Sequence, residues 1–580
     1  MKHRRIQMTA IALSTFLTAS AFGQVTAMAA GNTPPTPPSG SEAPGNPPDG
    51  AGGPGGMNGQ GGPGGAPGGN AGSATYDAAK TLSSDATESG QQYTATASDQ
   101  IALLVTGATV TEKNLTVNKS GDSDGGDNTN FYGQNAAVLA KDGAVLTISG
   151  GTITSDAEGA NGIFSYGGNG GQNGASGDGT TVNVQDVTIT TTGNSSGGIM
   201  TTGGGIMNAR NLTITTSGRS SAAIRTDRGG GTVDVTGGTY STSGAGSPAI
   251  YCTADITVQN ADLYSKTSEG VVIEGLNSVT LTNTDLTVNN TTTNGNATHH
   301  DAVMIYQSMS GDAADGTGRF TMTGGSITNS TGEVFHVTNT SAVITLSGVT
   351  ITNNGNGVLL DVSNDGWSGA ANQATLTTTN QTLSGDILVS NATVNGNSNA
   401  SSLTFRLGSG STYTGAINSS VSERGTVDMT IADTASWILT GDSTVSTLSG
   451  SGSINYNGYT LTVGSTSYDA THPYSGMSTS TETVEETPTE ASTITLQNTK
   501  KTFRTEQLAA QKQTYKLLAD SNATVSVSRY KGDAGRYIKV KQNGKVIVKK
   551  GTPAGKYKAV LRVTSSDGTT LTETIRVVVK

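Results

Sequence analysis

One short phrase of alternating apolar and polar residues recurs along the middle of the chain and restricts the folds available to it. Strict alternation indicates half-buried strands, because successive side chains of a strand point to opposite faces. A unit repeated at a fixed period predicts a solenoid, in which each unit packs only on its neighbours. The phrase occurs at Leu146–Thr154 (LTISGGTIT), Val182–Thr190 (VNVQDVTIT), Val233–Ser241 (VDVTGGTYS), Phe320–Thr328 (FTMTGGSIT) and Ile344–Thr352 (ITLSGVTIT).

Aligned phrases share four fixed positions. Two apolar positions lie two residues apart, Gly, Asn or Asp follows two residues later, and another apolar residue comes three further on. The Gly/Asn/Asp position predicts a corner, because these residues tolerate left-handed backbone best. Most rungs span about two dozen residues, and insertions at about 167–180 and 287–318 lengthen two of them. The corner residues are Gly150, Asp186, Asn211, Gly237, Asn260, Asn283, Gly324 and Gly348.

A second strand follows in every rung, and the residues predicted to face outward from it are mostly apolar. Such a stripe is unexpected on a solvent-facing surface. It is either a ligand surface or a face covered by an insertion or by the C-terminal domain. His336 and Cys252 are assigned to the interior. The candidate ligand-binding residues of the stripe are Phe164, Met200, Arg225, Tyr251, Met304 and Phe335, with Val272 and Leu359 in the same column.

The rest of the chain divides by composition. Basic residues, an apolar run and the A-x-A motif Ala27–Ala29 are typical of a signal peptide, so we expect a secreted, extracellular or surface-associated protein. No later segment is apolar enough to span a bilayer, so no integral membrane segment is expected in the mature protein. The predicted parts are a signal peptide (1–29), a Pro/Gly-rich linker (30–73), the solenoid (74–465), a Ser/Thr/Glu-rich linker (466–492) and a basic domain (493–580).

Charge separates the solenoid from the C-terminal domain. Residues 30–492 hold 12 Lys+Arg and 38 Asp+Glu, a net charge of −26, whereas residues 493–580 hold 18 and 5, a net charge of +13. The basic domain predicts an anionic partner, such as wall teichoic acid. The alternative is a solvated surface attracted to the acidic solenoid. Nucleic acid is not expected as the partner of an exported protein.

The sequence offers little support for catalysis. Asn283-Thr284-Asp285 matches one polygalacturonase fragment, but Asn283 occupies a corner position, and the paired aspartates, His-Gly and Arg-x-Lys motifs of that family are not found. Arg225 near Asp227 is a weak hint of a lyase, and Arg228 adds little to it, because one arginine beside one aspartate is typical of a surface pair. We therefore assign no catalytic residue and expect a protein that is not an enzyme.

Two segments carry candidate metal ligands. The Gly-rich stretch 121–130 crowds carboxylate and amide oxygens together, which predicts calcium, with a disordered acidic turn as the alternative. His299-His300-Asp301 lies in the long insertion and is either a metal-binding or a polar loop, and we favour the polar loop. The candidate calcium ligands are Asp122, Asp124, Asp127, Asn128 and Asn130.

Three segments resemble known families. Trp437–Leu448 (WILTGDSTVSTL) resembles a phrase of autotransporter passenger β-helices, and Gly551–Val563 (GTPAGKYKAVLRV) resembles the late strands of bacterial Ig-like domains. Residues 75–465 resemble, in repeat style, secreted β-helix adhesins and the carbohydrate-binding β-helix proteins of clostridia.

These resemblances imply an all-β chain, a right-handed parallel β-helix followed by a small Ig-like β-sandwich. They also imply binding of polysaccharide or host glycan at the cell surface, with calcium as an optional cofactor. A polysaccharide lyase or hydrolase acting on pectin-like substrates is one alternative. A structural surface-layer component is the other.

Overall fold

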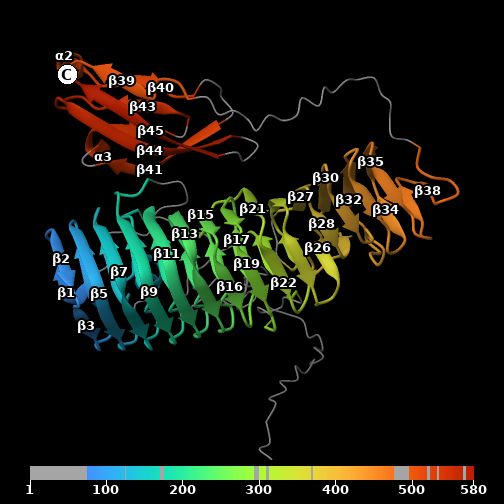
Figure 1. The fold of residues 1–580 in the computed structure, drawn as a ribbon, viewed down its shortest axis with the longest axis horizontal. Coiled ribbons are helices and arrows are strands. Elements are labelled where there is room, and N and C mark those ends of the chain that lie inside the picture. The colour runs from blue at the N-terminus through green and yellow to red at the C-terminus, as the bar shows by residue number, and fades with distance from the viewer. Residues whose placement is uncertain are drawn as a thin grey trace, which may run out of the picture. The chain divides into compact units, whose positions relative to one another are not determined.

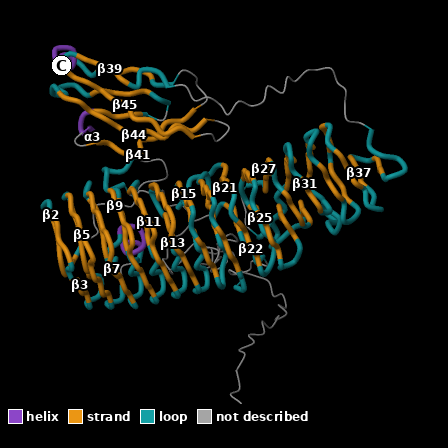
Figure 2. Tube along the Cα trace, viewed as in Figure 1, coloured by secondary structure: helices purple, strands orange, loops and turns teal. Residues whose placement is uncertain are grey.

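The computed structural model describes residues 75–580, except 124–125, 170–175, 293–298, 309–311, 367–369, 476–495, 519–522, 532–533, 542 and 566–569. The predicted signal peptide and first linker therefore lie outside the described residues, as does most of the second linker. Nearly all the regular elements within them are strands, which stack in chain order along the repeat region (Figure 1). Short loops connect the strands of successive rungs (Figure 2).

One short strand from each rung joins a parallel sheet that runs along the repeat region, here called the first sheet. Each strand pairs with the equivalent strand of the rungs before and after it. The first sheet comprises, in spatial order, β1 (Asp77–Leu82), β4 (Gln100–Thr106), β6 (Val138–Lys141), β8 (Ile163–Tyr166), β10 (Ile199–Thr202), β12 (Ile224–Thr226), β14 (Ile250–Cys252), β17 (Val271–Glu274), β20 (Val303–Tyr306), β23 (Phe335–Thr338), β26 (Val358–Val362) and β29 (Asp386–Val389).

The other strands of the rungs form the second sheet, which is also parallel and bends at the corner positions. From β5 to β13 one long strand runs through the corner, and later rungs divide there into two strands. The second sheet comprises β2 (Ala86–Ser89), β3 (Gln92–Ala95), β5 (Thr109–Lys119), β7 (Val145–Ser155), β9 (Thr181–Thr191), β11 (Gly205–Thr216), β13 (Gly231–Thr242), β15 (Asp255–Gln259), β16 (Asp262–Ser265), β18 (Ser278–Thr282), β19 (Asp285–Val288), β21 (Thr317–Thr323), β22 (Ser326–Asn329), β24 (Ser341–Ser347), β25 (Thr350–Asn353), β27 (Asn372–Thr379), β30 (Ser401–Leu407), β32 (Thr426–Ile431) and β35 (Thr447–Gly450).

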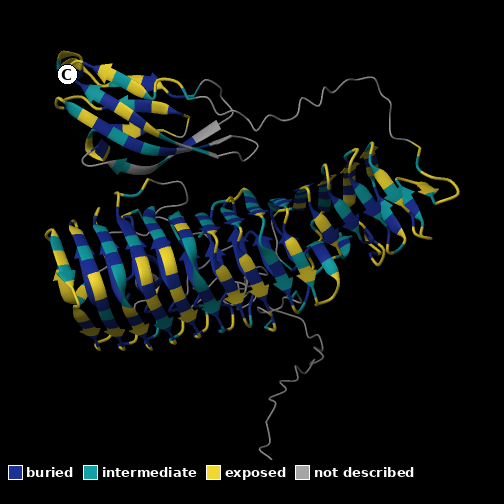
Figure 3. Ribbon diagram, in the orientation of Figure 1, coloured by how far each residue is buried: buried dark blue, intermediate teal, exposed yellow. Residues whose placement is uncertain are grey.

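The columns predicted from the phrases are confirmed by the strand register. Ile256 pairs with Val233 and with Val279, which lie 23 residues before and after it. These inward side chains belong to one continuous buried cluster that also contains Cys252. Buried and exposed positions alternate along the strands of the second sheet (Figure 3). The all-β chain of long stacked parallel strands is thus compatible with a parallel β-helix.

The corner positions are confirmed as left-handed. All eight predicted residues have a positive φ, between 47° and 73°. Asn114 and Asn380 occupy equivalent places in other rungs, with φ values of 51° and 48°. Left-handed backbone costs other L-residues roughly 1–2 kcal/mol, which explains the restriction to Gly, Asn and Asp. Asn283 is therefore explained by its backbone conformation.

The last rungs are less regular, and most of their strands are short. Trp437 is fully buried there, its ring lies 6.0 Å from that of Tyr413, and its Nε1 donates to the carbonyl of Gly415 over 2.9 Å. The strands of these rungs are β28 (Thr382–Ser384), β31 (Thr412–Thr414), β33 (Ser436–Ile438) and β36 (Ser453–Asn455) in one sheet, and β34 (Ser443–Val445), β37 (Leu461–Val463) and β38 (Thr466–Tyr468) in another.

The C-terminal residues form a unit of two small sheets around their own core. Val546 and Val577, which come from different sheets, belong to the same buried cluster. Its pairings are antiparallel except between β39 and β45. Its elements are β39 (Lys500–Phe503), α2 (Thr505–Ala510), β40 (Gln513–Lys516), β41 (Ala523–Lys531), α3 (Ala534–Tyr537), β42 (Ile538–Val540), β43 (Lys545–Val548), β44 (Gly555–Ser565) and β45 (Thr570–Val579).

None of the helices in the described part of the chain is long and apolar enough to cross a membrane.

Replacing Asn283 tests the corner. We expect Asn283→Val to destabilise the solenoid by about 1–2 kcal/mol, because a β-branched residue is strained at positive φ. Asn283→Gly also removes the amide, but glycine adopts a positive φ without strain, so the loss of stability should be smaller. Thermal unfolding followed by circular dichroism measures both. Equal losses of stability in the two variants would show that the amide side chain of Asn283, and not its backbone φ, stabilises the corner.

Candidate functional site

The predicted outward stripe lies on the outer face of the first sheet, and it is covered. Phe164 pairs with Met200, Met200 with Arg225 and Arg225 with Tyr251, so their side chains form one column. Tyr251 pairs in turn with Val272, and Val272 with Met304. Their exposed fractions run from 0% to 6%. Of the two alternatives left open by the sequence, the covered face is the one observed, and ligand binding by these residues stays a prediction.

The segment between β5 and β6 supplies part of the cover. The short helix α1 (Asp127–Tyr132) brings Phe131 and Tyr132 into one buried cluster with Phe164 and Met200. The carbonyl of Phe131 accepts a hydrogen bond from Thr202 over 2.7 Å.

The assignment of Phe335 and Leu359 to the stripe was wrong. Phe335 pairs with Val303 and packs in the interior, with its ring 5.7 Å from that of Phe320. Leu359 also belongs to the interior cluster. His336, assigned to the interior, pairs with Met304 and therefore continues the outward column. A slip of one residue exchanges the two faces of a strand, and the turn before β23 decides the register.

Arg225 and Asp227 form a buried ion pair. Arg225 is fully buried, and its Nη2 and Nε atoms lie 2.5 and 3.2 Å from a carboxylate oxygen of Asp227. Arg228 binds Asp312, 84 positions later, with Nη2 and Nε at 2.7 and 3.0 Å. Its guanidinium carbon lies 3.9 Å from the centre of the Phe131 ring. These contacts hold the second insertion against the column.

Glu274 lies beneath the same insertion. Its carboxylate accepts hydrogen bonds from the hydroxyls of Tyr251 over 2.6 Å, Tyr306 over 3.2 Å and Ser308. Burial raises the pKa of Glu274 to about 7, and the neighbouring carboxylates of Asp312 and Asp227 add to the effect. A group buried to this degree is closed to a polysaccharide.

Further along the column, two histidines and two carboxylates converge. One ligand atom from each of His299, Glu333, His336 and Asp361 lies within 4.8 Å of all the others. His336 and Asp361 are directly paired on β23 and β26. Glu333 lies two residues before β23, and His299 comes from the insertion between β19 and β20. Three segments of the chain thus meet at one place, which we call the histidine–carboxylate cluster.

The cluster has strong internal electrostatics. Burial disfavours the charged form of His299, but its contact with Glu333 outweighs this and raises the pKa of His299 to about 10. Burial likewise opposes the charge of Glu333, and the same contact holds the pKa of Glu333 below its usual range. Burial lowers the pKa of His336 and raises that of Asp361.

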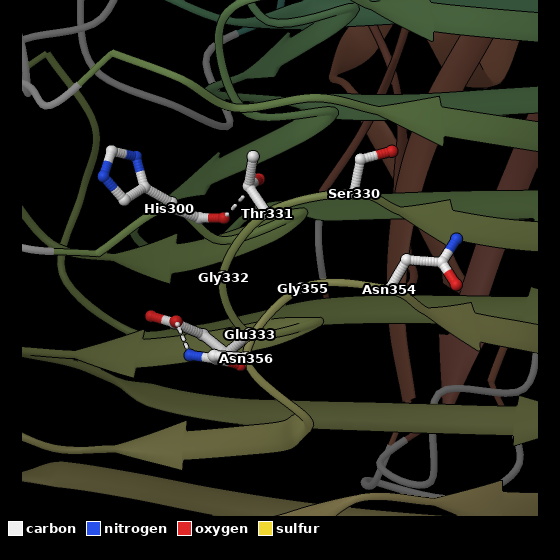
Figure 4. A pocket seen from close by; sticks show the side chains of 8 residues that line it. All are labelled: His300, Ser330, Thr331, Gly332, Glu333, Asn354, Gly355 and Asn356. Atoms are coloured by element: carbon white, nitrogen blue, oxygen red, sulfur yellow. Dashed lines mark hydrogen bonds between the residues drawn. The ribbon is translucent and has the colours of Figure 1, made fainter.

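A pocket of about 390 Å³ borders the cluster. It is formed by the turns that follow β22 and β25 on successive rungs, and Glu333 belongs to both pocket and cluster. Asn356 Nδ2 donates to Glu333 over 3.2 Å, and Thr331 donates to the carbonyl of His300 (Figure 4). The lining residues are His300, Ser330, Thr331, Gly332, Glu333, Asn354, Gly355 and Asn356.

The predicted calcium ligands are only partly described. Asp124 lies outside the described residues, and so do the side chains of Asp127 and Asn128, which begin α1. Asp122 is exposed and accepts the backbone N–H of Glu158 over 2.8 Å, whereas Asn130 is buried on the helix. The second half of the stretch is therefore helical instead of an open loop, and calcium binding stays a prediction.

The sequence singled out His299 but missed its partners. The signal was present, because His336 and Asp361 stand at equivalent places in neighbouring rungs. Adjacent apolar residues Val334 and Phe335 permit two registers for β23, and the register that begins one residue earlier turns His336 inward.

Replacing Glu274 tests its environment. Its pKa of about 7 exceeds the unfolded value of about 4.3, so its protonated form stabilises the fold below pH 4.3 and this stability is lost as pH rises towards 7. We expect Glu274→Gln to remove the pH dependence that Glu274 contributes in that interval, about 4 kcal/mol of unfolding free energy. Thermal unfolding from pH 4.5 to 7.5 measures it. The control is Glu423→Gln, which replaces an exposed glutamate and should show the same dependence of stability on pH as the parent. If the stability of Glu274→Gln changes with pH as that of the parent does, the prediction is contradicted.

No protein-family model matches the chain, and no curated protein or solved structure matches it at the significance required.

Proposed function

We propose that this chain is an exported right-handed parallel β-helix that binds polysaccharide or host glycan at the cell surface without transforming it. The observation that carries the proposal is the pocket beside β22 and β25. Its volume lies in the range of small-ligand sites. Ser330, Asn354 and Asn356 are exposed in it, and hydroxyl and amide groups both donate and accept hydrogen bonds, as sugar hydroxyls require.

The pocket replaces the apolar stripe as the proposed ligand site, because the stripe is buried. Gly355 shapes it: a Cβ there would lie 1.2 Å from the carbonyl oxygen of Thr331, so only glycine lets the two turns approach so closely. The net charge of −26 on residues 30–492 disfavours acidic sugars, so the ligand we propose is a neutral glycan.

Glycan binding is testable on the full chain. We expect it to bind a neutral glycan on an array, and the double variant Ser330→Ala, Asn354→Ala to lose about tenfold in affinity or more, because each lost hydrogen bond costs about 1 kcal/mol. Asn118→Ala, an exposed asparagine of β5, is the matched control. The array is run with and without EDTA. If the chain binds no glycan with or without EDTA, the proposal is contradicted and a structural surface-layer component is favoured.

The same samples separate binding from catalysis. Incubation with pectin, cellulose and host glycans should release neither reducing nor unsaturated sugars. Their release would favour the lyase or hydrolase alternative.

For the C-terminal unit we propose a bacterial Ig-like sandwich that attaches the protein to an anionic cell-wall polymer. Lys516 of β40 and Lys545 of β43 lie directly opposite each other, and the N–H of Lys541 bonds to the carbonyl of Lys545. All three side chains are exposed. Like charges placed side by side on a sheet are unfavourable alone and are stabilised by a polyanion.

Attachment is tested with walls that carry teichoic acid. The full chain should be retained, and retention should fall as salt rises, because screening weakens exposed charge pairs. The triple variant Lys516→Gln, Lys541→Gln, Lys545→Gln and a chain ending at residue 492 should be released. Equal retention of the intact and shortened chains would remove the attachment function.

A further inference from the structure

The histidine–carboxylate cluster has the donor set of a transition-metal site. It offers two imidazole nitrogens and two carboxylate oxygens, all within 4.8 Å of one another. Two of the four donors are fixed by the sheet itself, because His336 and Asp361 are directly paired on neighbouring strands, about 4.8 Å apart. Glu333 precedes the same strand by two residues, and only His299 comes from an insertion.

Hydrogen bonds within the protein do not account for His336. Its side chain is fully buried, yet neither Nδ1 nor Nε2 has a hydrogen-bond partner among the described residues, and the same is true of Asp361 Oδ1. Its ring stacks on that of His299, with the centroids 3.8 Å apart and the planes at 26°. A buried polar group without a partner costs about 1–3 kcal/mol. The nitrogens of His336 therefore point to a ligand that the protein itself does not supply.

We propose that His299, Glu333, His336 and Asp361 bind a divalent transition-metal ion with the coordination chemistry of zinc. Zinc takes four nitrogen and oxygen ligands in a tetrahedron, with bonds of about 2.0–2.2 Å. Such bonds place the ligand atoms about 3.4 Å apart, so the wider spacings of the cluster must contract modestly and the direct His299–Glu333 contact must open. Calcium and magnesium prefer all-oxygen sites, and the two imidazoles count against them.

The surroundings suit a cation and hold the ligands in place. Asp301 is buried nearby, and burial together with the charges of Glu269 and Glu333 raises its pKa, so a bound cation would also favour its charged form. Asn356 donates to the second carboxylate oxygen of Glu333 over 3.2 Å, which fixes the orientation of that ligand. Outer contacts of this kind are typical of metal sites and strengthen binding. The proposal does not depend on the glycan pocket, since the metal alone is sufficient to test it.

Zinc binding by the untagged full chain is the test. After treatment with EDTA and dialysis, titration with zinc chloride should reveal a site of one ion per chain, and bound zinc should raise the unfolding temperature. Cobalt in place of zinc should give the intense visible absorption of a four-coordinate site. His336→Gln and Asp361→Asn should each weaken this site by about 100-fold or more. His472→Gln, which removes a histidine with an 86% exposed side chain, should leave it unchanged.

Two variants are used so that the loss of a metal ligand can be distinguished from misfolding. Asp361→Asn preserves the side-chain shape, whereas His336→Gln changes it, and circular dichroism checks that each variant is folded. The absence of stoichiometric zinc binding by the parent chain would overturn the proposal. So would parent-like affinity in both folded variants, or displacement of zinc by an equal concentration of calcium. Zinc binding without glycan binding would support the metal site while removing the proposed glycan function.

Discussion

Each rung of the solenoid can bury its inward side chains only against the rungs before and after it, so the interior exists only while neighbouring rungs stay in register. The pairing of Ile256 with Val233 and Val279 illustrates the condition. A fully buried aliphatic side chain contributes about 1.5–3 kcal/mol, and a rung displaced by one residue would turn that side chain towards solvent. The corner residues with positive φ protect the register, since they fix where each strand turns.

The same register arranges the outer face. Residues at equivalent places in successive rungs form a column about 4.8 Å apart, whatever their chemistry. In the first sheet this column runs from the aromatic and aliphatic residues beneath α1, through the Arg225–Asp227 pair, to His336 and Asp361. Insertions then cover the column, and Asp312 joins one of them to Arg228. A buried polar site on a solenoid thus needs only a side chain in the column and a loop long enough to close over it.

The sequence was sufficient for what repeats. Strand positions, corners and the interior place of Cys252 follow from residue types that recur in every rung. It was insufficient where a turn changes length. Val334, Phe335 and Val337 are all apolar, so the pattern permits two registers for β23, and the backbone hydrogen bonds of the preceding turn decide between them. The buried partner of Arg228 was equally hidden, because Asp312 comes 84 residues later.

Uniform rungs also have a genetic consequence. Since Ile256 meets Val233 on one side and Val279 on the other in the same way, a rung is bounded by two equivalent surfaces. Duplication or loss of a stretch of 23 codons would therefore leave the strand pairing of the remaining rungs in register. Recombination between repeats can therefore lengthen or shorten the solenoid without requiring a new core. The distance over which the solenoid extends a bound ligand or an attached domain would change with it.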